Sequence, residues 1–217
     1  MSFLEEVKMK YCFSTEVVDL DNQAPNRNKR ESKYFWDFYK PGKLSGIDLI
    51  LSAGDVKSEY LSFLVTMANR PLLYIHGNHD GNYAQKPPEG CECIEDRIVR
   101  VNGLRILGLG GTRKYNNGSH QYTERQMERR IRRLWWKLYR SKGVDIVVTH
   151  SPPAGVGDAD DYAHRGFEAF LPLMEKYKPA YLVHGHVHKN YSHNFVRERQ
   201  YASTTVINSS GYHIFEI

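Results

Sequence analysis

The stretch PLLYIHGNHD at residues 71–80 decides the fold, because a short apolar run ends abruptly in polar residues that can bind metal ions. Continuous apolar runs of this length are typical of strands that are buried on both faces. Open α/β sheets place their binding sites at the carboxyl ends of such strands. Three further stretches repeat the pattern: residues 47–53 before Gly54-Asp55, residues 144–149 before His150, and residues 180–183 before His184-Gly185-His186-Val187-His188.

The rest of the chain predicts an α/β domain with mixed sheets. Helical spacing of apolar residues predicts helices near residues 58–69, 122–140 and 166–177. Residues 96–101 and 104–109, joined by Asn-Gly, predict a hairpin, and we expect a second hairpin from residues 200–208 and 212–217. No internal repeat is present, so we assign residues 1–217 to a single domain. The polar segment 19–30 is expected to be a loop or insertion.

The positive charge of the chain belongs to one segment. The net charge is +5, and residues 122–142 hold eight Lys or Arg and two Glu, which gives 8 − 2 = +6. Thr123 and Gln126 form a capping-box pattern, and an apolar stripe follows at helical spacing: Met127, Ile131, Leu134, Trp135 and Leu138. The basic helix 123–140 has two interpretations. Its cationic face is solvated, as charge runs usually are, or it binds an acidic partner such as a nucleic acid.

Composition also bears on compartment. The first ten residues have no apolar core of a signal peptide, and no stretch approaches the roughly 18 consecutive apolar residues of a membrane span. Three cysteines, Cys12, Cys91 and Cys93, do not suggest a disulfide framework. We therefore expect a cytoplasmic protein without a membrane partner.

Histidines gather in the turns after the apolar runs. Of ten histidines, six lie there together with Asp55 and Asn78: His76, His79, His150, His184, His186 and His188. Imidazole, carboxylate and carboxamide donors suit Mn, Fe, Zn, Co or Ni better than metals that prefer thiolates. Two divalent metal ions would explain why so many ligands converge, since such a pair activates water and clamps a phosphoryl group. His76 and His184 precede their motifs, and strand alternation predicts that they point elsewhere.

Four motifs carry a resemblance to a known family: Gly54-Asp55, Gly77-Asn78-His79-Asp80, Thr149-His150-Ser151-Pro152-Pro153 and Gly185-His186-Val187-His188. In this order they resemble the calcineurin-like metallophosphoesterase superfamily. The segments 31–36, 108–111 and 164–168 are similar to a compact bacterial subgroup without a cap domain. The resemblance implies a four-layer α/β/β/α sandwich with two mixed β-sheets.

The resemblance also implies residue roles. Asp55 would bridge two metal ions. Asn78, His150 and His186 would complete the second metal site, and His188 would serve the first. His79 would face the leaving-group oxygen, either as general acid or as a cation that stabilises charge, with Asp80 orienting its ring.

The first motif of the superfamily departs from the pattern in this chain. An Asp followed two residues later by His is typical there, whereas Glu16 and Val18 stand at these positions if the first strand covers residues 9–16. Glu16 is therefore the expected first-motif ligand, with Asp19 and Asp21 as alternatives. A longer side chain shifts a carboxylate by more than the roughly 0.5 Å that a precise site tolerates.

The spacing between motifs leaves no room for a cap, so we expect an open site. His164 and Arg165, at the expected start of the helix 166–177, are the candidate substrate-binding residues. The function that we predict is metal-dependent hydrolysis of a phosphate ester, more specifically a phosphodiester, through a dimetal-activated hydroxide. Two alternatives stay open: a weakened or inactive metal-binding relative that acts as a binding protein, and a nucleic-acid phosphodiesterase.

Overall fold

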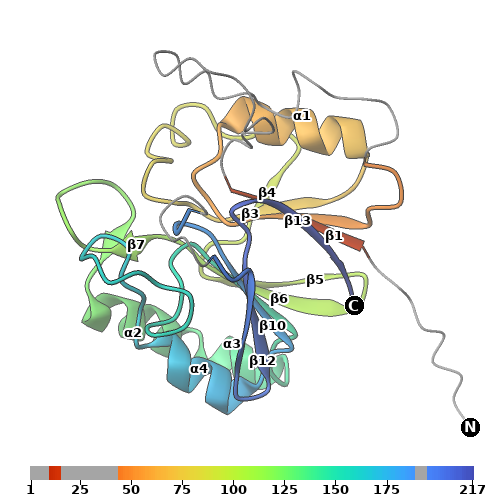
Figure 1. The fold of residues 1–217 in the computed structure, drawn as a ribbon. Helices are drawn as coiled ribbons and strands as arrows, with labels where there is room; N and C mark the ends of the chain where they lie inside the picture. Colours follow the sequence, from red (N-terminus) through yellow and green to blue (C-terminus); the bar gives the residue numbers. More distant parts are fainter. Residues whose placement is uncertain (1–9, 16–43, 189–194) are drawn as a thin grey trace, which may run out of the picture.

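Two mixed β-sheets lie face to face at the centre of the computed structural model, which describes residues 10–15, 44–188 and 195–217 (Figure 1). The first sheet has the order β13-β1-β2-β3-β4, with β13 antiparallel to β1 and the other neighbours parallel. Its strands are β13 Gly211–Glu216, β1 Lys10–Thr15, β2 Leu49–Ser52, β3 Leu72–Tyr74 and β4 Glu92–Cys93.

The second sheet has the order β11-β12-β10-β9-β6-β5. The pairs β11·β12 and β5·β6 are antiparallel, and the central pairs are parallel. Its strands are β11 Glu198–Tyr201, β12 Thr204–Asn208, β10 Tyr181–His184, β9 Ile146–Thr149, β6 Leu104–Leu109 and β5 Arg97–Val101. The short strands β7 Thr112–Arg113 and β8 Gln121–Tyr122 form a separate pair.

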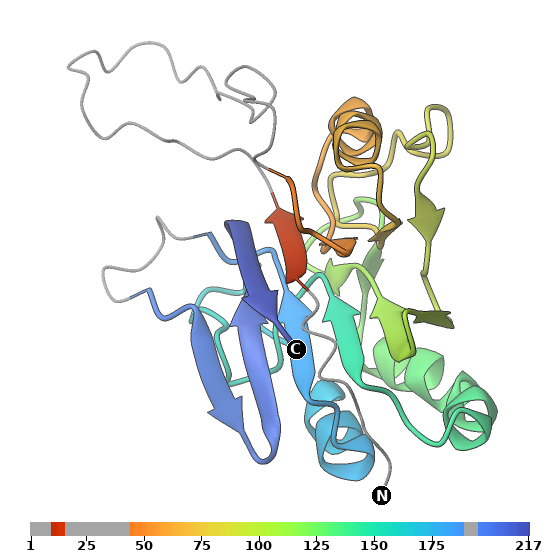
Figure 2. The same ribbon diagram turned by 90° about the vertical axis from the view of Figure 1, so that its right-hand side faces the viewer.

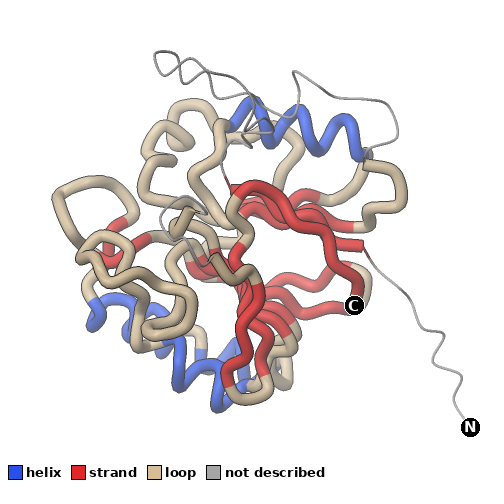
Figure 3. The backbone as a smooth tube through the Cα atoms, in the orientation of Figure 1, coloured by secondary structure: helices blue, strands red, loops and turns tan. Residues whose placement is uncertain are grey.

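Helices cover the outer faces of the two sheets, as Figure 3 shows. The helix α1 Ser58–Ala68 lies over the first sheet, and α2 Glu124–Arg133, α3 Trp135–Arg140 and α4 Phe170–Tyr177 lie on the outer side of the second (Figures 1 and 2). None of the helices in the described ranges is long and apolar enough to span a bilayer.

Three apolar cores separate the four layers. Leu61 and Leu64 of α1 pack against Ile50 and Leu72 of the first sheet. Between the sheets, Leu51 and Leu73 belong to the same core as Ile146 and Val183. The third core joins the second sheet to α2, α3 and α4, and its buried side chains include Phe167, Phe170, Met127, Leu138 and Met174. The expected four-layer α/β/β/α sandwich with two mixed β-sheets is thus confirmed.

Most expected elements are present with somewhat different bounds, and several predictions were wrong in detail. The helix 122–140 divides at Leu134, whose backbone N–H bonds to the carbonyl oxygen of Ile131, three residues back, and so tightens the turn. Trp135 then lies on the exposed side rather than on the apolar stripe. The helix 166–177 begins only at Phe170, so that Pro172 falls in its first turn, where a missing N–H costs little.

The predicted hairpin from 200–208 and 212–217 was also wrong. Residues 200–208 contain a turn of their own, with Ala202 in the left-handed region, and this turn pairs β11 with β12. After β12 the chain leaves the second sheet, and β13 pairs with β1 of the first. The chain makes this crossing because β12 already has β10 as its other neighbour. The predicted loop 19–30 lies outside the described residues, and the assignment of all of 1–217 to one domain stays a prediction.

Candidate metal centre

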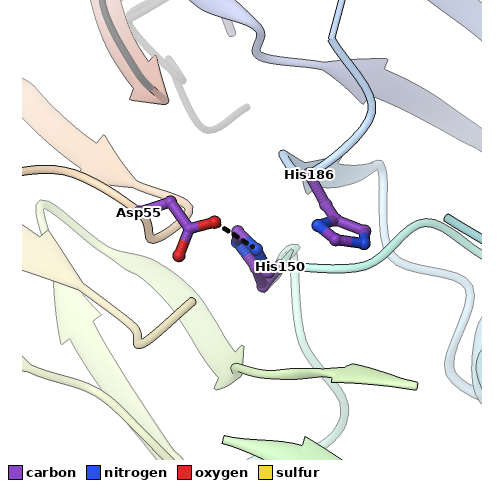
Figure 4. Close-up of side chains that lie close together, drawn as sticks. All are labelled: Asp55, His150 and His186. Atoms are coloured by element: carbon purple, nitrogen blue, oxygen red, sulfur yellow. Dashed lines mark ion pairs between the residues drawn. The ribbon is translucent and has the colours of Figure 1, made fainter. Parts of the chain in front are cut away.

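The centre forms where the carboxyl ends of four parallel strands meet between the two sheets. Asp55 follows β2, and Asn78 follows the neighbouring strand β3 of the first sheet. His150 follows β9, and His186 follows the neighbouring strand β10 of the second sheet. Asp55, His150 and His186 each place one ligand atom within 4.8 Å of the others (Figure 4). The facing sheets therefore bring together side chains that are up to 131 residues apart in sequence, since 186 − 55 = 131.

The turns that carry Asp55 and Asn78 approach each other closely enough to require glycine. A Cβ on Gly77 would lie 2.0 Å from Asp55 Oδ1, and a Cβ on Gly54 would lie 2.4 Å from the backbone nitrogen of Gly77. Gly54 also has φ +89°, and Asp55 itself has φ +57°, a conformation that costs a non-glycine residue free energy. The glycines of both motifs thus serve the contact between the two turns.

His150 is completely buried and directs one ring nitrogen, Nε2, into the centre. Its Nδ1–H donates a hydrogen bond of 2.6 Å to the carbonyl oxygen of Ala53. Its Nε2 lies 3.2 Å from Asp55 Oδ2 and 3.2 Å from Asn78 Oδ1. Two oxygen acceptors and an imidazole nitrogen therefore converge. Such a cluster needs a cation at its centre, either a metal ion or a proton on His150.

The charges of the cluster shift its pKa values accordingly. Burial alone would lower the pKa of His150, but the charge of Asp55 raises it. Burial alone would raise the pKa of Asp55, but the charge and the hydrogen bond of His150 hold it well below its usual range. Asp55 is thus a carboxylate at neutral pH, as a metal ligand must be.

His186 is a neutral imidazole, oriented by the backbone. Its Nε2–H donates a 2.9 Å hydrogen bond to the carbonyl oxygen of Ala163, which leaves Nδ1 as the nitrogen with a lone pair. Burial and the charge of His150 lower the pKa of His186 to about 3. Its backbone φ is +64°, so this ligand position is strained as well. Neutral imidazoles, a carboxylate and a carboxamide oxygen are a donor set that fits a divalent ion of the Mn-to-Zn series.

Tyr115 fixes the orientation of the Asn78 side chain. Asn78 Nδ2–H donates a 2.9 Å hydrogen bond to Tyr115 Oη, so Asn78 Oδ1 points toward His150. A free amide could flip and present N–H donors to the centre, which would repel a cation. The Ser119 hydroxyl donates a hydrogen bond of 3.3 Å to the backbone carbonyl oxygen of Asn78 and so holds the turn that carries this side chain.

Asp80 holds the two ligand turns of the first sheet together. Its Oδ2 accepts hydrogen bonds from the backbone N–H of Asp55 at 2.8 Å and of Gly77 at 2.7 Å. Burial raises the pKa of Asp80 to about 6. His79 is exposed next to the centre, and its backbone N–H donates to Asp55 Oδ1 at 2.8 Å. The orientation of the His79 ring by Asp80 stays a prediction.

His164 lies against the centre, and Arg165 is exposed to solvent. The His164 ring lies 4.8 Å from the ring of His186, and its Nδ1 is 2.9 Å from both carboxylate oxygens of Asp161. The expected position at a helix start was wrong, because α4 begins five residues after Arg165. The substrate-binding role of both residues stays a prediction.

A buried ion network supports the turn before Asn78. Glu95 accepts hydrogen bonds from the backbone N–H of His76 and of Gly110, and it pairs with Arg130. Burial alone would raise the pKa of Glu95, but His76 and Arg130 hold it at about 2. Burial alone would lower the pKa of His76, but Cys93 and Glu95 raise it to about 10. His76 thus stabilises this turn through its ion pair with Glu95.

Apart from Asp55, the predicted ligands of the first metal site do not join this cluster among the described residues. Glu16 and the alternatives Asp19 and Asp21 lie outside the described residues. Within the described ranges, Asp55, His150 and His186 form the group that is close enough to share one ion, and His188 is not in it. The roles of Glu16 and His188 at a first metal site stay predictions. His184 is buried, and its Nδ1 lies 3.0 Å from the Gly185 carbonyl oxygen.

Comparisons with known proteins match most of the chain. A family model described as Calcineurin-like phosphoesterase matches residues 26–190. The UPF0046 protein T07D4.2 of Caenorhabditis elegans is 28% identical over 125 residues, which cover 55% of this chain and 30% of that protein. The UPF0046 protein K07C11.7 of the same organism is 23% identical over 177 residues, which cover 66% of this chain and 57% of that protein. The chain therefore spans less than two thirds of either relative.

Solved structures share the fold. One crystal structure superposes with a TM-score of 0.65 at 12% sequence identity and covers 96% of this chain and 95% of its own. The crystal structure of TT1561 of Thermus thermophilus superposes with a TM-score of 0.51 at 15% identity, and it covers 77% of this chain and 78% of its own. At such identities the similarity concerns the fold alone.

Proposed function

Because the chain belongs to the calcineurin-like phosphoesterase family, we propose that it hydrolyses a phosphodiester at a centre of two divalent metal ions. The observation that carries the proposal is the convergence of Asp55 Oδ2 and Asn78 Oδ1 on Nε2 of His150, whose Nδ1–H is donated to the carbonyl oxygen of Ala53. Lone pairs that converge in a buried turn cluster are the arrangement of a metal site.

Asp55, Asn78, His150 and His186 would hold one ion, and Asp55 would share a second with His188 and Glu16. When bound, the ions would supply an activated water and neutralise the charge of the phosphate oxygens. Backbone carbonyl groups at Ala53 and Ala163 keep the two imidazoles in the tautomers that a cation needs.

His79 is the candidate for the leaving-group side of the reaction. Its backbone N–H is bound to Asp55, which places it at the centre, and its side chain is exposed to an incoming ester. It would donate a proton to the departing oxygen or stabilise the charge that develops there. His164, held by Asp161, and Arg165 would contact the phosphate from the opposite turn. The absence of room for a cap favours a diester over a small monoester.

The test is hydrolysis of an aryl phosphodiester with Mn, Ni, Co or Zn, measured beside the metal content of the purified protein. Asp55→Asn removes a carboxylate from the cluster, so both metal content and turnover should be lost. His79→Ala should keep the metal and lose about 100-fold or more in kcat. Normal turnover by Asp55→Asn would contradict the proposal.

A second candidate function is metal binding without turnover. The observation that favours it is Glu16 at the position where the superfamily carries Asp. This candidate predicts one bound ion and no hydrolysis with any of the four metals. Glu16→Asp then separates the candidates further, because it should raise turnover if Glu16 weakens the first site. The cytoplasm stays the predicted compartment, because three cysteines do not suggest a disulfide framework.

A further inference from the structure

The outer surface of α2 and α3 combines positive charge with exposed aromatic rings, and the centre described above does not use it. Between Thr123 and Lys142 the chain carries eight Lys or Arg and two Glu. Arg130 is buried and bound to Glu95 and Asp96, so it is part of the interior. Six other cationic side chains of the two helices are exposed: Arg125, Arg129, Arg132, Arg133, Lys137 and Arg140.

Three aromatic side chains lie among these cations. Trp135 is 55% exposed, Trp136 is 52% exposed and Tyr139 is 70% exposed. Trp135 and Trp136 are in edge contact with centroids 5.4 Å apart, and Trp136 stacks on Tyr139 at 5.8 Å. Burial of three large rings is normally favourable, so their exposure on one short helix marks a contact surface.

The fold does not need these aromatic rings. The inward side of the two helices is already filled by Met127, Leu134 and Leu138, which are buried in the core against the second sheet. Within α2, Arg125, Arg129 and Arg132 follow one another at spacings of four and three residues, which place their side chains on one helical face. Within α3, Trp136 and Arg140 lie four residues apart and share a face in the same way. Figures 1 and 2 show these helices on the outer side of the second sheet.

We propose that the outer face of α2 and α3 binds single-stranded nucleic acid. Its guanidinium groups would bind successive phosphates, and its aromatic rings would stack on unpaired bases. A duplex could use only the cations, because its bases are stacked inside the helix. An anionic bilayer is less suitable, since the cations alternate with the rings and would enter the apolar layer with them.

Binding on this face does not depend on the proposed hydrolysis. The amino-terminal end of α2 follows β8, and β8 pairs with β7, which lies just before Tyr115, the residue that bonds to Asn78. A strand that is held along α3 and α2 could therefore extend toward the centre. Loss of turnover and loss of binding are separate results, because the aromatic and cationic residues named here are not in the metal cluster.

The experiment measures the fluorescence anisotropy of a labelled single-stranded oligonucleotide of about 20 nucleotides, a length that exceeds the site of one small domain. A matched duplex and vesicles of phosphatidylserine and phosphatidylcholine serve as competing ligands. Probe integrity is checked on a gel after each titration. Trp136→Ala should weaken single-strand binding about tenfold. Tyr212→Ala removes a partly exposed aromatic ring on β13 and should leave the affinity unchanged.

Salt dependence tests the cationic part of the surface. The triple variant Arg129→Gln, Arg132→Gln and Arg133→Gln should reduce the slope of log affinity against log salt by about 2, at about 0.7 per phosphate contact. Arg70→Gln with Arg100→Gln removes exposed charges elsewhere and should leave the slope unchanged. Equal affinity for single strand and duplex, wild-type affinity of Trp136→Ala, or binding to vesicles without binding to the oligonucleotide would each overturn the proposal.

Discussion

Asp80→Ala should separate the two ligand turns of the first sheet. Asp80 Oδ2 accepts the backbone N–H groups of Asp55 and Gly77, and the bond to Gly77 is buried. Removal of the acceptor leaves two N–H groups without a partner, at about 1–3 kcal/mol each. We expect the free energy of unfolding to fall by about 3 kcal/mol, which is a large part of the stability of a small domain.

Asp80→Asn is the matched variant. The amide oxygen keeps an acceptor with two lone pairs in nearly the same place, so the loss should be about 1 kcal/mol or less. Urea unfolding in the presence of a chelator measures both variants without a contribution from bound metal. Glu128→Ala, on the exposed side of α2, should change stability by no more than about 0.5 kcal/mol. The reasoning is refuted if Asp80→Ala is as stable as Glu128→Ala, or if Asp80→Asn loses as much as Asp80→Ala.

Three further predictions concern the residues around the centre. Tyr115→Phe removes the hydrogen bond that orients the Asn78 side chain, so the affinity for Mn, measured by titration calorimetry, should fall about tenfold. Unchanged affinity would show that the Asn78 amide keeps its orientation without this hydrogen bond. Gly77→Ala places a methyl group 2.0 Å from a carboxylate oxygen of the centre, and the loss of Mn binding should exceed that of Tyr115→Phe. Glu95 has a folded-state pKa of about 2, below its ordinary 4.5, so it contributes stability above pH 4.5 that is lost as the pH falls toward 2. The stability difference between wild type and Glu95→Gln should therefore be about 3 kcal/mol at pH 7 and shrink below pH 4.5, and a difference that does not depend on pH would contradict this assignment.

The strand ends were the most predictable part of the fold. Apolar runs buried on both faces leave a simple pattern in sequence, and the turns after β2, β3, β9 and β10 lie where that pattern places them. The crossing of β13 to the first sheet was not predictable in the same way. Its burial alternates, as does that of any half-exposed strand, and nothing local distinguishes a hairpin partner from a distant one.

The site could be predicted as a set of residue types but not as a set of contacts. Asp55, Asn78, His150 and His186 follow from strand-end positions. Tyr115 lies 37 residues from Asn78, on a turn without periodicity, so its hydrogen bond is visible only in three dimensions. The backbone carbonyl groups of Ala53 and Ala163, which orient the two imidazoles, are present at every residue, so no pattern of side chains marks them in the sequence.

Crystals of the protein soaked in Mn²⁺ and measured for anomalous scattering test the central claim most directly. We predict a peak at about 2.1–2.3 Å from Asp55, Asn78, His150 and His186, with Nε2 of His150 and Nδ1 of His186 as the nitrogen ligands. The absence of a peak at these atoms, with Mn²⁺ bound elsewhere on the chain, would contradict the account.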